Sequence, residues 1–338
     1  MTVPETPPEK PSRLPRLLAQ GLASAILLGL LVPLAGIAAL FAPGPLTAPA
    51  TIVVAHGERT ADIGARLAQD GAVYLAVLFR GAAHLVADHS LEAGEYEIPP
   101  HASPLAIALM IHEGRSVLRL FTVPEGLTSA EIARLLEKDP ALTGAIAVPP
   151  PEGSLLPESY RYAYGDSRDG LIERMQKAMR EKRAAIWAGR ENGLPLKSPE
   201  EMVVIASMIE KETGRADERA RIAGVFYNRL RLNMRLQSDP TVIYALTNGG
   251  GVLARPLTHD DLAVASPVNT YANDGLPPQP ICNPGRAALE AAAHPEHNNF
   301  LYFVADGSGG HAFAADLATQ DANIKRWHQA TGNQAGAR

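Results

Sequence analysis

Cysteine is nearly absent from this chain of 338 residues, because Cys282 is the only one. A single cysteine cannot form a disulfide within the chain, so a fold held by internal bridges is excluded, and the redox compartment is left open. An excess of basic residues is also lacking. The chain has 31 Lys and Arg against 36 Asp and Glu, a net charge of -5 and no long basic run. We therefore expect no nucleic-acid partner.

Motifs that bind metal ions or phosphates are weak. His294 and His297 in HPEH, together with His259, could be read as metal ligands, but Pro295 separates the first two and their neighbours are of surface type. The glycines of residues 306–311, DGSGGH, connect two alternating segments instead of opening a helix, so they predict a hairpin turn and not a phosphate loop. We expect no metal and no cofactor.

A long uncharged stretch is present near the N-terminus. Hydrophobic residues make up 46% of the chain and charged residues 20%, which is ordinary globular composition with room for two cores. From Gly21 to Ala42 no residue is charged, and 22 helical residues at 1.5 Å each would cross a bilayer core of about 30 Å. Basic residues precede this stretch at Lys10, Arg13 and Arg16.

Basic residues favour the cytoplasmic side of a membrane. We therefore predict a cytoplasmic tail over 1–19, a single membrane-spanning helix over 20–42, a linker over 43–50, and an exported remainder. A cleaved signal peptide ending near residues 48–50 is the alternative, although the apolar stretch is longer than such peptides usually have.

Residues 51–123 predict a small α+β module. The segment 51–71 reads as an alternating strand, a turn at Gly57 and an amphipathic helix capped by Thr60, with Ile63 and Leu67 on its apolar face. A looser copy has a Ser cap and a Pro at 103–104, and the same spacing returns at Gly126, Ser129, Ile132 and Leu136. Such a unit is similar to LysM-like domains, which bind glycans that contain N-acetylglucosamine.

Residues 124–330 predict a larger, mixed α+β domain, followed by a tail over 331–338. A helix is expected from about Gly170 to Asn192. The next helix has an N-cap at Ser198, Pro199 in the first position and Glu201 in the third, which is the pattern of a capping box. The overall fold class is α+β.

Two acids close this second helix. The segment 206–214, ASMIEKETG, is apolar up to Glu210 and Glu212, where unpaired helix carbonyls carry a partial negative charge. Burial and this potential disfavour the ionised carboxylate, so we expect a raised pKa, as a general acid requires. We prefer Glu210, because Ala206 and Ser207 leave room for a ligand beside it. The alternative is a solvated pair of acids with Lys211 as ion partner.

Polar residues gather in the following segments. The stretch 266–285 is rich in Pro, Asn and Gly and has too little apolar content to be core; long irregular segments of this kind are often functional. The side chains that could bind sugars or other polar ligands here and nearby are Gln237, Asp239, Asn269, Thr270, Tyr271, Asn228 and Glu212.

Four blocks carry a resemblance to a known family. They are ASMIEKET at 206–213, NRLRLNMRLQSDPTVIY at 228–244, NTYANDGLPPQPICNPG at 269–285 and HPEHNNFLYFVADGSGGHAF at 294–313. In this order, and behind an apolar N-terminal segment, they resemble the membrane-anchored endolytic murein transglycosylases, the YceG-like family.

The resemblance implies an exported, membrane-anchored bacterial enzyme that cleaves peptidoglycan between N-acetylmuramic acid and N-acetylglucosamine. The cleavage is non-hydrolytic and leaves 1,6-anhydro ends, and the family's essential acid falls on Glu210. Our own hypothesis is that Glu210 acts as general acid and then as base, and that the seven polar residues named above contact the substrate. The expected location is the inner membrane with the catalytic part in the periplasm, and the resemblance suggests glycan-polymerising synthases as partners. The alternative is a non-catalytic, membrane-anchored scaffold that binds peptidoglycan.

Overall fold

The computed structural model describes residues 14–86 and 91–331, of which 14–21, 23–26 and 331 are described by their backbone alone. The described chain is mixed α+β, as predicted, with helices and three two-stranded sheets. It divides into two compact units, Met1–Leu118 with Ala163–Gly165, and Arg119–Tyr162 with Asp166–Arg338. Most of the predicted tail at 1–19, and all but one residue of that at 331–338, lie outside the described residues.

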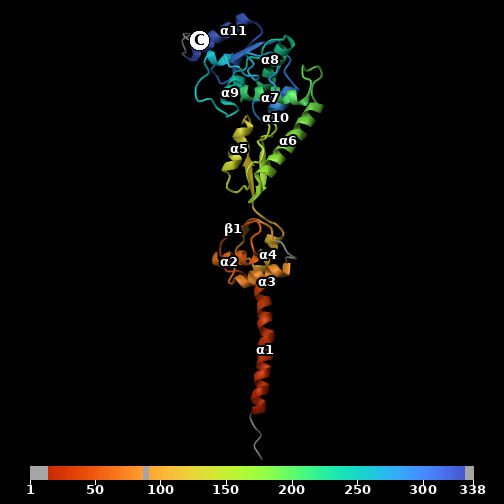
Figure 1. Ribbon diagram of the computed structural model, residues 1–338, viewed down its shortest axis with the longest axis vertical. Coiled ribbons are helices and arrows are strands. Elements are labelled where there is room, and N and C mark those ends of the chain that lie inside the picture. Colours follow the sequence, from red (N-terminus) through yellow and green to blue (C-terminus); the bar gives the residue numbers. More distant parts are fainter. Residues whose placement is uncertain (1–13, 87–90, 332–338) are drawn as a thin grey trace, which may run out of the picture. The chain divides into compact units, whose positions relative to one another are not determined.

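The first unit contains helix α1 (Leu14–Phe41) and a small α+β core (Figure 1). Strands β1 (Ala50–Val54) and β2 (Gly94–Ile98) pair antiparallel, with Ala50 opposite Ile98. Helices α2 (Thr60–Gln69), α3 (Ala76–Val86) and α4 (Pro104–His112) pack with them. Ile63, Leu67, Phe79 and Tyr96 are fully buried, so the apolar periodicity correctly predicted the core-facing side of α2.

The predicted helix cap at Thr60 is wrong by one residue. Arg59 is the N-cap of α2 and makes no side-chain cap bond, while Thr60 is the first helical residue. In the copy of the motif at 126–136, the N-cap is Thr128, whose hydroxyl accepts from the Glu131 N–H. The Ser129 hydroxyl donates to the Pro151 carbonyl instead. The cap predicted at Ser103 is confirmed.

Helix α1 carries apolar side chains that are exposed from Leu27 to Ile37, and Leu40 near its end is buried in the core of the first unit. In the part of the chain that the structure describes, no helix has the length and apolar character that crossing a bilayer requires. The spanning helix over 20–42 stays a prediction.

The second unit is built around α7 (Pro199–Glu212). Ser198 caps α7 by accepting from the Glu201 N–H, as predicted, but the Glu201 carboxylate accepts from the N–H of Lys197 rather than closing a capping box. Every residue from Met202 to Ile209 is buried, because α7 packs against α8 (Arg219–Arg231), α10 (Arg286–Ala293) and α6 (Arg168–Ala188) (Figure 1). Helix α6 begins two residues earlier than predicted, at Arg168, and ends four residues earlier, at Ala188, where Gly189 is the C-cap.

This unit contains further elements. They are β3 (Leu118–Thr122) paired with β4 (Ser159–Ala163), α5 (Ser129–Lys138), α9 (Asp239–Thr247), the 3-10 turn η1 (Asp260–Ala263), α11 (Leu317–Thr331), and the predicted hairpin of β5 (Tyr302–Ala305) and β6 (His311–Ala314).

The irregular segment 266–285 differs from its prediction. It lacks regular structure as expected, but it is not confined to the surface: Asn269, Thr270, Ile281, Cys282 and Asn283 are all buried. The Ile281 N–H donates to the hydroxyl of Ser207 on α7, at 3.0 Å. Polar residues can be buried here because hydrogen bonds to neighbouring segments satisfy them.

Candidate active site

Glu210 lies in the last turn of α7, with its side chain 6% exposed. The helix ends there because Thr213 adopts an extended conformation. The Gly285 N–H donates to Glu210 Oε2 at 2.8 Å, and Arg219 Nη2 lies 3.7 Å from Oε1. Lys211, which the sequence offered as ion partner, donates instead to the Gly126 carbonyl at 3.3 Å.

Burial raises the pKa of Glu210, and the nearby charge of Glu125 raises it further. The Gly285 N–H and Arg219 act in the opposite direction, because both stabilise the ionised carboxylate. Burial outweighs them, so the direction is that expected from the sequence. A carboxyl group whose pKa is raised holds its proton to higher pH than an ordinary glutamate, which suits it to protonate a leaving group.

The loop that follows β3 approaches Glu210 closely. Gly126 has φ +77, and a Cβ there would lie 3.6 Å from Glu210 Cγ. The Gly126 N–H donates to the Asn283 carbonyl at 3.1 Å, which ties this loop to the segment that holds Glu210. Glu125 is exposed and its carboxylate lies against Gly285, because a Cβ built on Gly285 would overlap Glu125 Oε1.

A second acid of this region is Glu152, which is half-buried. Glu152 Oε1 accepts from the Ser129 N–H at 2.9 Å and from Asn283 Nδ2 at 3.2 Å, and Oε2 accepts from the Tyr244 hydroxyl at 3.2 Å. Burial raises the pKa of Glu152, although these donors oppose the rise. The sequence reasoning missed Glu125, Glu152 and Asn283. A signal was present, since Pro-Glu-Gly occurs at 124–126 and again at 151–153.

Glu212 has a different set of partners from Glu210, as expected for two acids two residues apart on a helix. The Ser238 hydroxyl donates to Glu212 Oε1 at 2.5 Å. Burial raises the pKa of Glu212 to about 7, the charge of Asp239 adds to the rise, and Arg229 opposes it. On protonation alone Glu212 is the rival of Glu210 as an acid, but its carboxyl group is occupied by the loop that starts α9.

The structure brings together part of the predicted polar set. The Tyr271 hydroxyl donates to Asp239 Oδ1 at 2.6 Å, and Arg229 Nη1 donates to Gln237 Oε1 at 3.1 Å. Gln237 and Asp239 are exposed and Tyr271 is half-buried, so these three have surface to offer a ligand. Gln237 has φ +49, which fixes the turn before α9.

The remaining residues of that set have structural partners. Asn269 is fully buried and donates to the carbonyls of Leu262 and Val264, and Thr270 is 1% exposed, with its hydroxyl 2.9 Å from that of Thr241. Direct contact with a sugar, expected for these two, is therefore replaced by a role in shaping the loop. Asn228 donates to the carbonyls at 298 and 300, away from Glu210.

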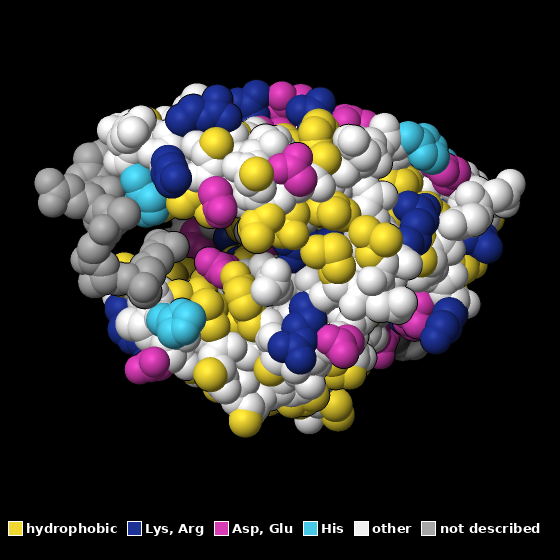
Figure 2. Space-filling model, turned by 90° about the horizontal axis from the view of Figure 1, so that it is seen from above, with side chains coloured by type: hydrophobic (Ala, Val, Ile, Leu, Met, Phe, Trp, Pro, Cys, Tyr) yellow, Lys and Arg dark blue, Asp and Glu magenta, His cyan; other side chains and the backbone are white. Residues whose placement is uncertain are grey.

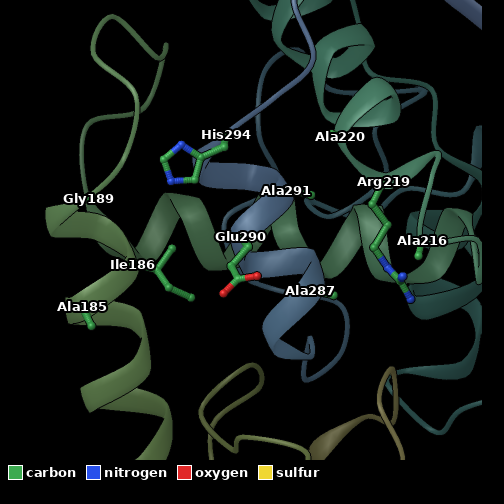
Figure 3. A pocket seen from close by; sticks show the side chains of 10 residues that line it. All are labelled: Ala185, Ile186, Gly189, Ala216, Arg219, Ala220, Ala287, Glu290, Ala291 and His294. Atoms are coloured by element: carbon green, nitrogen blue, oxygen red, sulfur yellow. The ribbon is translucent and has the colours of Figure 1, made fainter.

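A groove of about 550 Å³ lies on the exposed face of α10 (Figure 3). Ala287, Glu290, Ala291 and His294 form its floor, between the end of α6 and the start of α8. Arg219 lines this groove and also contacts Glu210, so the Arg219 side chain connects the groove with the acid. Arg219 Nε is buried and has no hydrogen-bond partner among the described residues.

The face viewed in Figure 2 is hollowed, and both hydrophobic and charged side chains lie near the hollow. Within the described chain, no three His, Cys, Asp or Glu residues are grouped so that they could hold a metal ion. The two histidines of HPEH diverge: His294 lines the groove on α10, and His297 Nε2 lies 3.0 Å from Glu191 Oε1.

Comparisons with known proteins match most of this chain. The model of the YceG-like family matches residues 52–326. The endolytic murein transglycosylase of Bacillus subtilis is 37% identical over 170 residues, 50% of this chain and 45% of that protein. That of Streptococcus pneumoniae R6 is 28% identical over 311 residues, 79% of this chain and 56% of that protein.

This chain therefore spans about half the length of these curated relatives. Among solved structures, a yceG-like protein of Listeria monocytogenes matches with a TM-score of 0.50 and 30% identity, covering 81% of this chain and 98% of that one.

Proposed function

We propose, on the premise that this chain belongs to the YceG-like family, that it is an endolytic murein transglycosylase. Its substrate is the glycan of peptidoglycan, and its reaction cuts the bond from N-acetylmuramic acid to N-acetylglucosamine. The observation that carries the proposal is the Glu210 carboxyl group, which is buried at the end of α7, has a raised pKa, and contacts Arg219, a residue that lines a groove. The names of the two curated relatives support the reaction class.

The reaction needs one acid that later acts as a base. Protonated Glu210 gives its proton to the bridging oxygen, and the C1–O bond breaks with its electron pair going to that oxygen. The 6-hydroxyl oxygen of the muramic acid then bonds to C1 and gives its proton to the Glu210 carboxylate. The product is a 1,6-anhydro end, and Glu210 is again protonated.

The neighbours of Glu210 support both halves of this cycle. Burial favours the protonated form that starts the reaction, and the Gly285 N–H and Arg219 stabilise the anion that follows proton transfer. Gln237, Asp239 and Tyr271 are the candidate sugar contacts, because their side chains keep accessible surface. Tyr271 can also stack on a sugar face.

The test replaces the acid by its neutral isostere. The chain with Glu210→Gln is incubated with purified glycan strands, and the new ends are identified by mass spectrometry. We expect a loss of at least about a hundredfold in anhydro-ended fragments, since general acid catalysis typically contributes this much. Glu200→Gln is the matched control, because Glu200 lies on the same helix and is largely exposed. Undiminished anhydro ends with Glu210→Gln would refute the assignment.

Two further outcomes separate the alternatives. Reducing ends in place of anhydro ends would mean that water attacks C1, which contradicts the non-hydrolytic mechanism. If the Glu210→Gln chain still performs the whole cellular role, the protein is a peptidoglycan-binding scaffold and not an enzyme.

The N-terminal region completes the proposal. Residues 20–42 anchor the chain in the bacterial inner membrane with the N-terminus in the cytoplasm, and residues 51–123 form a LysM-like glycan-binding module before the catalytic domain at 124–330. The uncharged segment from Gly21 to Ala42 supports the anchor. Glycan-polymerising synthases are the proposed partners. Retention of the chain in carbonate-washed membranes tests the anchor, and release into the wash would refute it.

A further inference from the structure

Gly285 separates two acids. Its N–H donates to Glu210 Oε2, and on its other side the carboxyl group of Glu125 fills the space that a side chain would take. A Cβ at residue 285 would overlap Oε1 and Cδ of Glu125 and would lie 2.7 Å from its Cγ. Gly285 has φ -75 and ψ 172, which any residue can adopt. Glycine is therefore needed here for space and not for backbone conformation.

The backbone at Glu125 is held in place on two sides. Gly126 packs on Glu210 and accepts from Lys211 Nζ, and its N–H donates to the Asn283 carbonyl. The Glu125 side chain itself is exposed. Glu125 thus combines a fixed backbone with a carboxylate that a ligand beside Glu210 can reach.

We propose that Glu125 is the second carboxylate of the active site, facing the sugar whose bridging oxygen Glu210 protonates. This inference rests on the proposed function. As the C1–O bond breaks, positive charge develops on C1 and the ring oxygen, and the negative charge of Glu125 stabilises it. Glu125 exchanges no atoms: the proton leaves Glu210 for the bridging oxygen, and Glu210 later takes the proton of the 6-hydroxyl.

The charges around Glu210 give Glu125 a second effect. Glu125 is the acid that raises the pKa of Glu210 by its charge, and Arg219 is the cation that lowers it. Lys211, next to Glu210 in sequence, is turned to the Gly126 carbonyl. Removal of the Glu125 charge should therefore lower the pKa of Glu210, and the alkaline limb of the rate profile should move to lower pH.

The experiment uses two variants that disable Glu125 in different ways. Glu125→Gln removes the charge and keeps the shape. Gly285→Ala keeps the charge but displaces the Glu125 side chain from Gly285, and because Glu125 is exposed the displaced carboxylate can move into solvent. We expect each to lower kcat on glycan strands by about a hundredfold, as for loss of one electrostatic contact in a transition state, and to shift the alkaline limb downward.

The double variant tests whether the two changes act through the same group. Because Gly285→Ala acts only by displacing Glu125, the double variant should be no slower than Glu125→Gln alone. Glu137→Gln is the control, since Glu137 is exposed on α5 of the same unit, and its kcat and rate profile should match those of the unchanged chain. Tryptophan fluorescence checks that each variant is folded.

Failures of the two proposals are distinguishable. An active unchanged chain with an equally active Glu125→Gln variant overturns this inference alone, as does a lower kcat with an unmoved alkaline limb. Additive losses in the double variant also overturn it, because Gly285→Ala would then act through something other than Glu125. If the unchanged chain releases no fragments, the proposed function falls and the inference with it. If Gly285→Ala fails to fold, Glu125→Gln decides.

Discussion

Asn283 connects three segments near the candidate active site, and its replacement should lower the free energy of unfolding of the second unit. Its Oδ1 accepts from the Leu155 N–H at 2.9 Å, and its Nδ2 donates to the carbonyl of Leu127, the hydroxyl of Ser129 and the carboxylate of Glu152. Asn283 is fully buried, so no water replaces these partners at the surface.

The loss of stability in Asn283→Ala depends on which hydrogen-bond partners of Asn283 have a second partner. Leu127 O also accepts from the backbone N–H at 283, and Glu152 Oε1 also accepts from the Ser129 N–H. The Leu155 N–H loses the acceptor that it has in the structure, which costs about 1–3 kcal/mol for a buried donor. The small cavity adds to this, and we expect the free energy of unfolding to fall by about 2–4 kcal/mol.

The measurement is urea unfolding followed by tryptophan fluorescence. The chain has two tryptophans, Trp187 and Trp327, and both belong to the second unit, so the signal reports that unit alone. Asn299→Ala is the control: Asn299 is exposed, and its replacement should change the free energy by less than about 0.5 kcal/mol. An equally small change for Asn283→Ala would refute the argument that Asn283 holds these segments together.

Two other predictions concern α7 and α8. Because burial raises the pKa of Glu212 from 4.5 to about 7, the folded chain holds a proton that the unfolded chain has released; the free energy of unfolding should fall as pH rises from about 4.5 to about 7 and should level off above. Glu212→Gln should flatten this slope in urea titrations at several pH values, and an unchanged slope would contradict the assignment. Gly224→Ala should destabilise the second unit by about 1–3 kcal/mol, since its Cβ would overlap the Glu296 carbonyl and lie 2.6 Å from Asn298 Nδ2. A midpoint equal to that of the unchanged chain in the same fluorescence assay would contradict that packing.

Helix α7 and its acid could be predicted because the information is local. Ser198 and Pro199 determine the start of the helix, and the unbroken apolar run up to Ile209 indicates burial on all sides. The raised pKa of Glu210 followed from the same run, since burial is its main cause. The N-cap residue of α5 could not be predicted, because Thr128 and Ser129 are neighbours and both can cap a helix. The Ser129 hydroxyl donates to the distant Pro151 carbonyl, which leaves Thr128 as the cap.

The partners of Glu210 could not be predicted, because they come from distant parts of the sequence. Gly285 follows Glu210 by 75 residues in the sequence. Glu125, which lies against Gly285, belongs to a loop that precedes Glu210. The composition of 266–285 gives a wrong prediction. A stretch poor in apolar residues predicts surface, whereas amides and hydroxyls of this segment are buried and hydrogen-bonded to other segments. The sequence did not predict helix α10, because its buried face is mostly alanine and therefore gives a weak apolar pattern.

The hydrogen bonds of Asn283 to Leu127 span 156 residues of sequence, and that of Gly285 to Glu210 spans 75. Such closures form only after the intervening chain has been synthesised and collapsed. A ribosome-bound or truncated chain that stops before residue 283 would carry Glu210 as an ordinary, freely ionising acid. Under the proposed function, the acid of the reaction therefore has its native partners only after residues 283–285 have packed against α7.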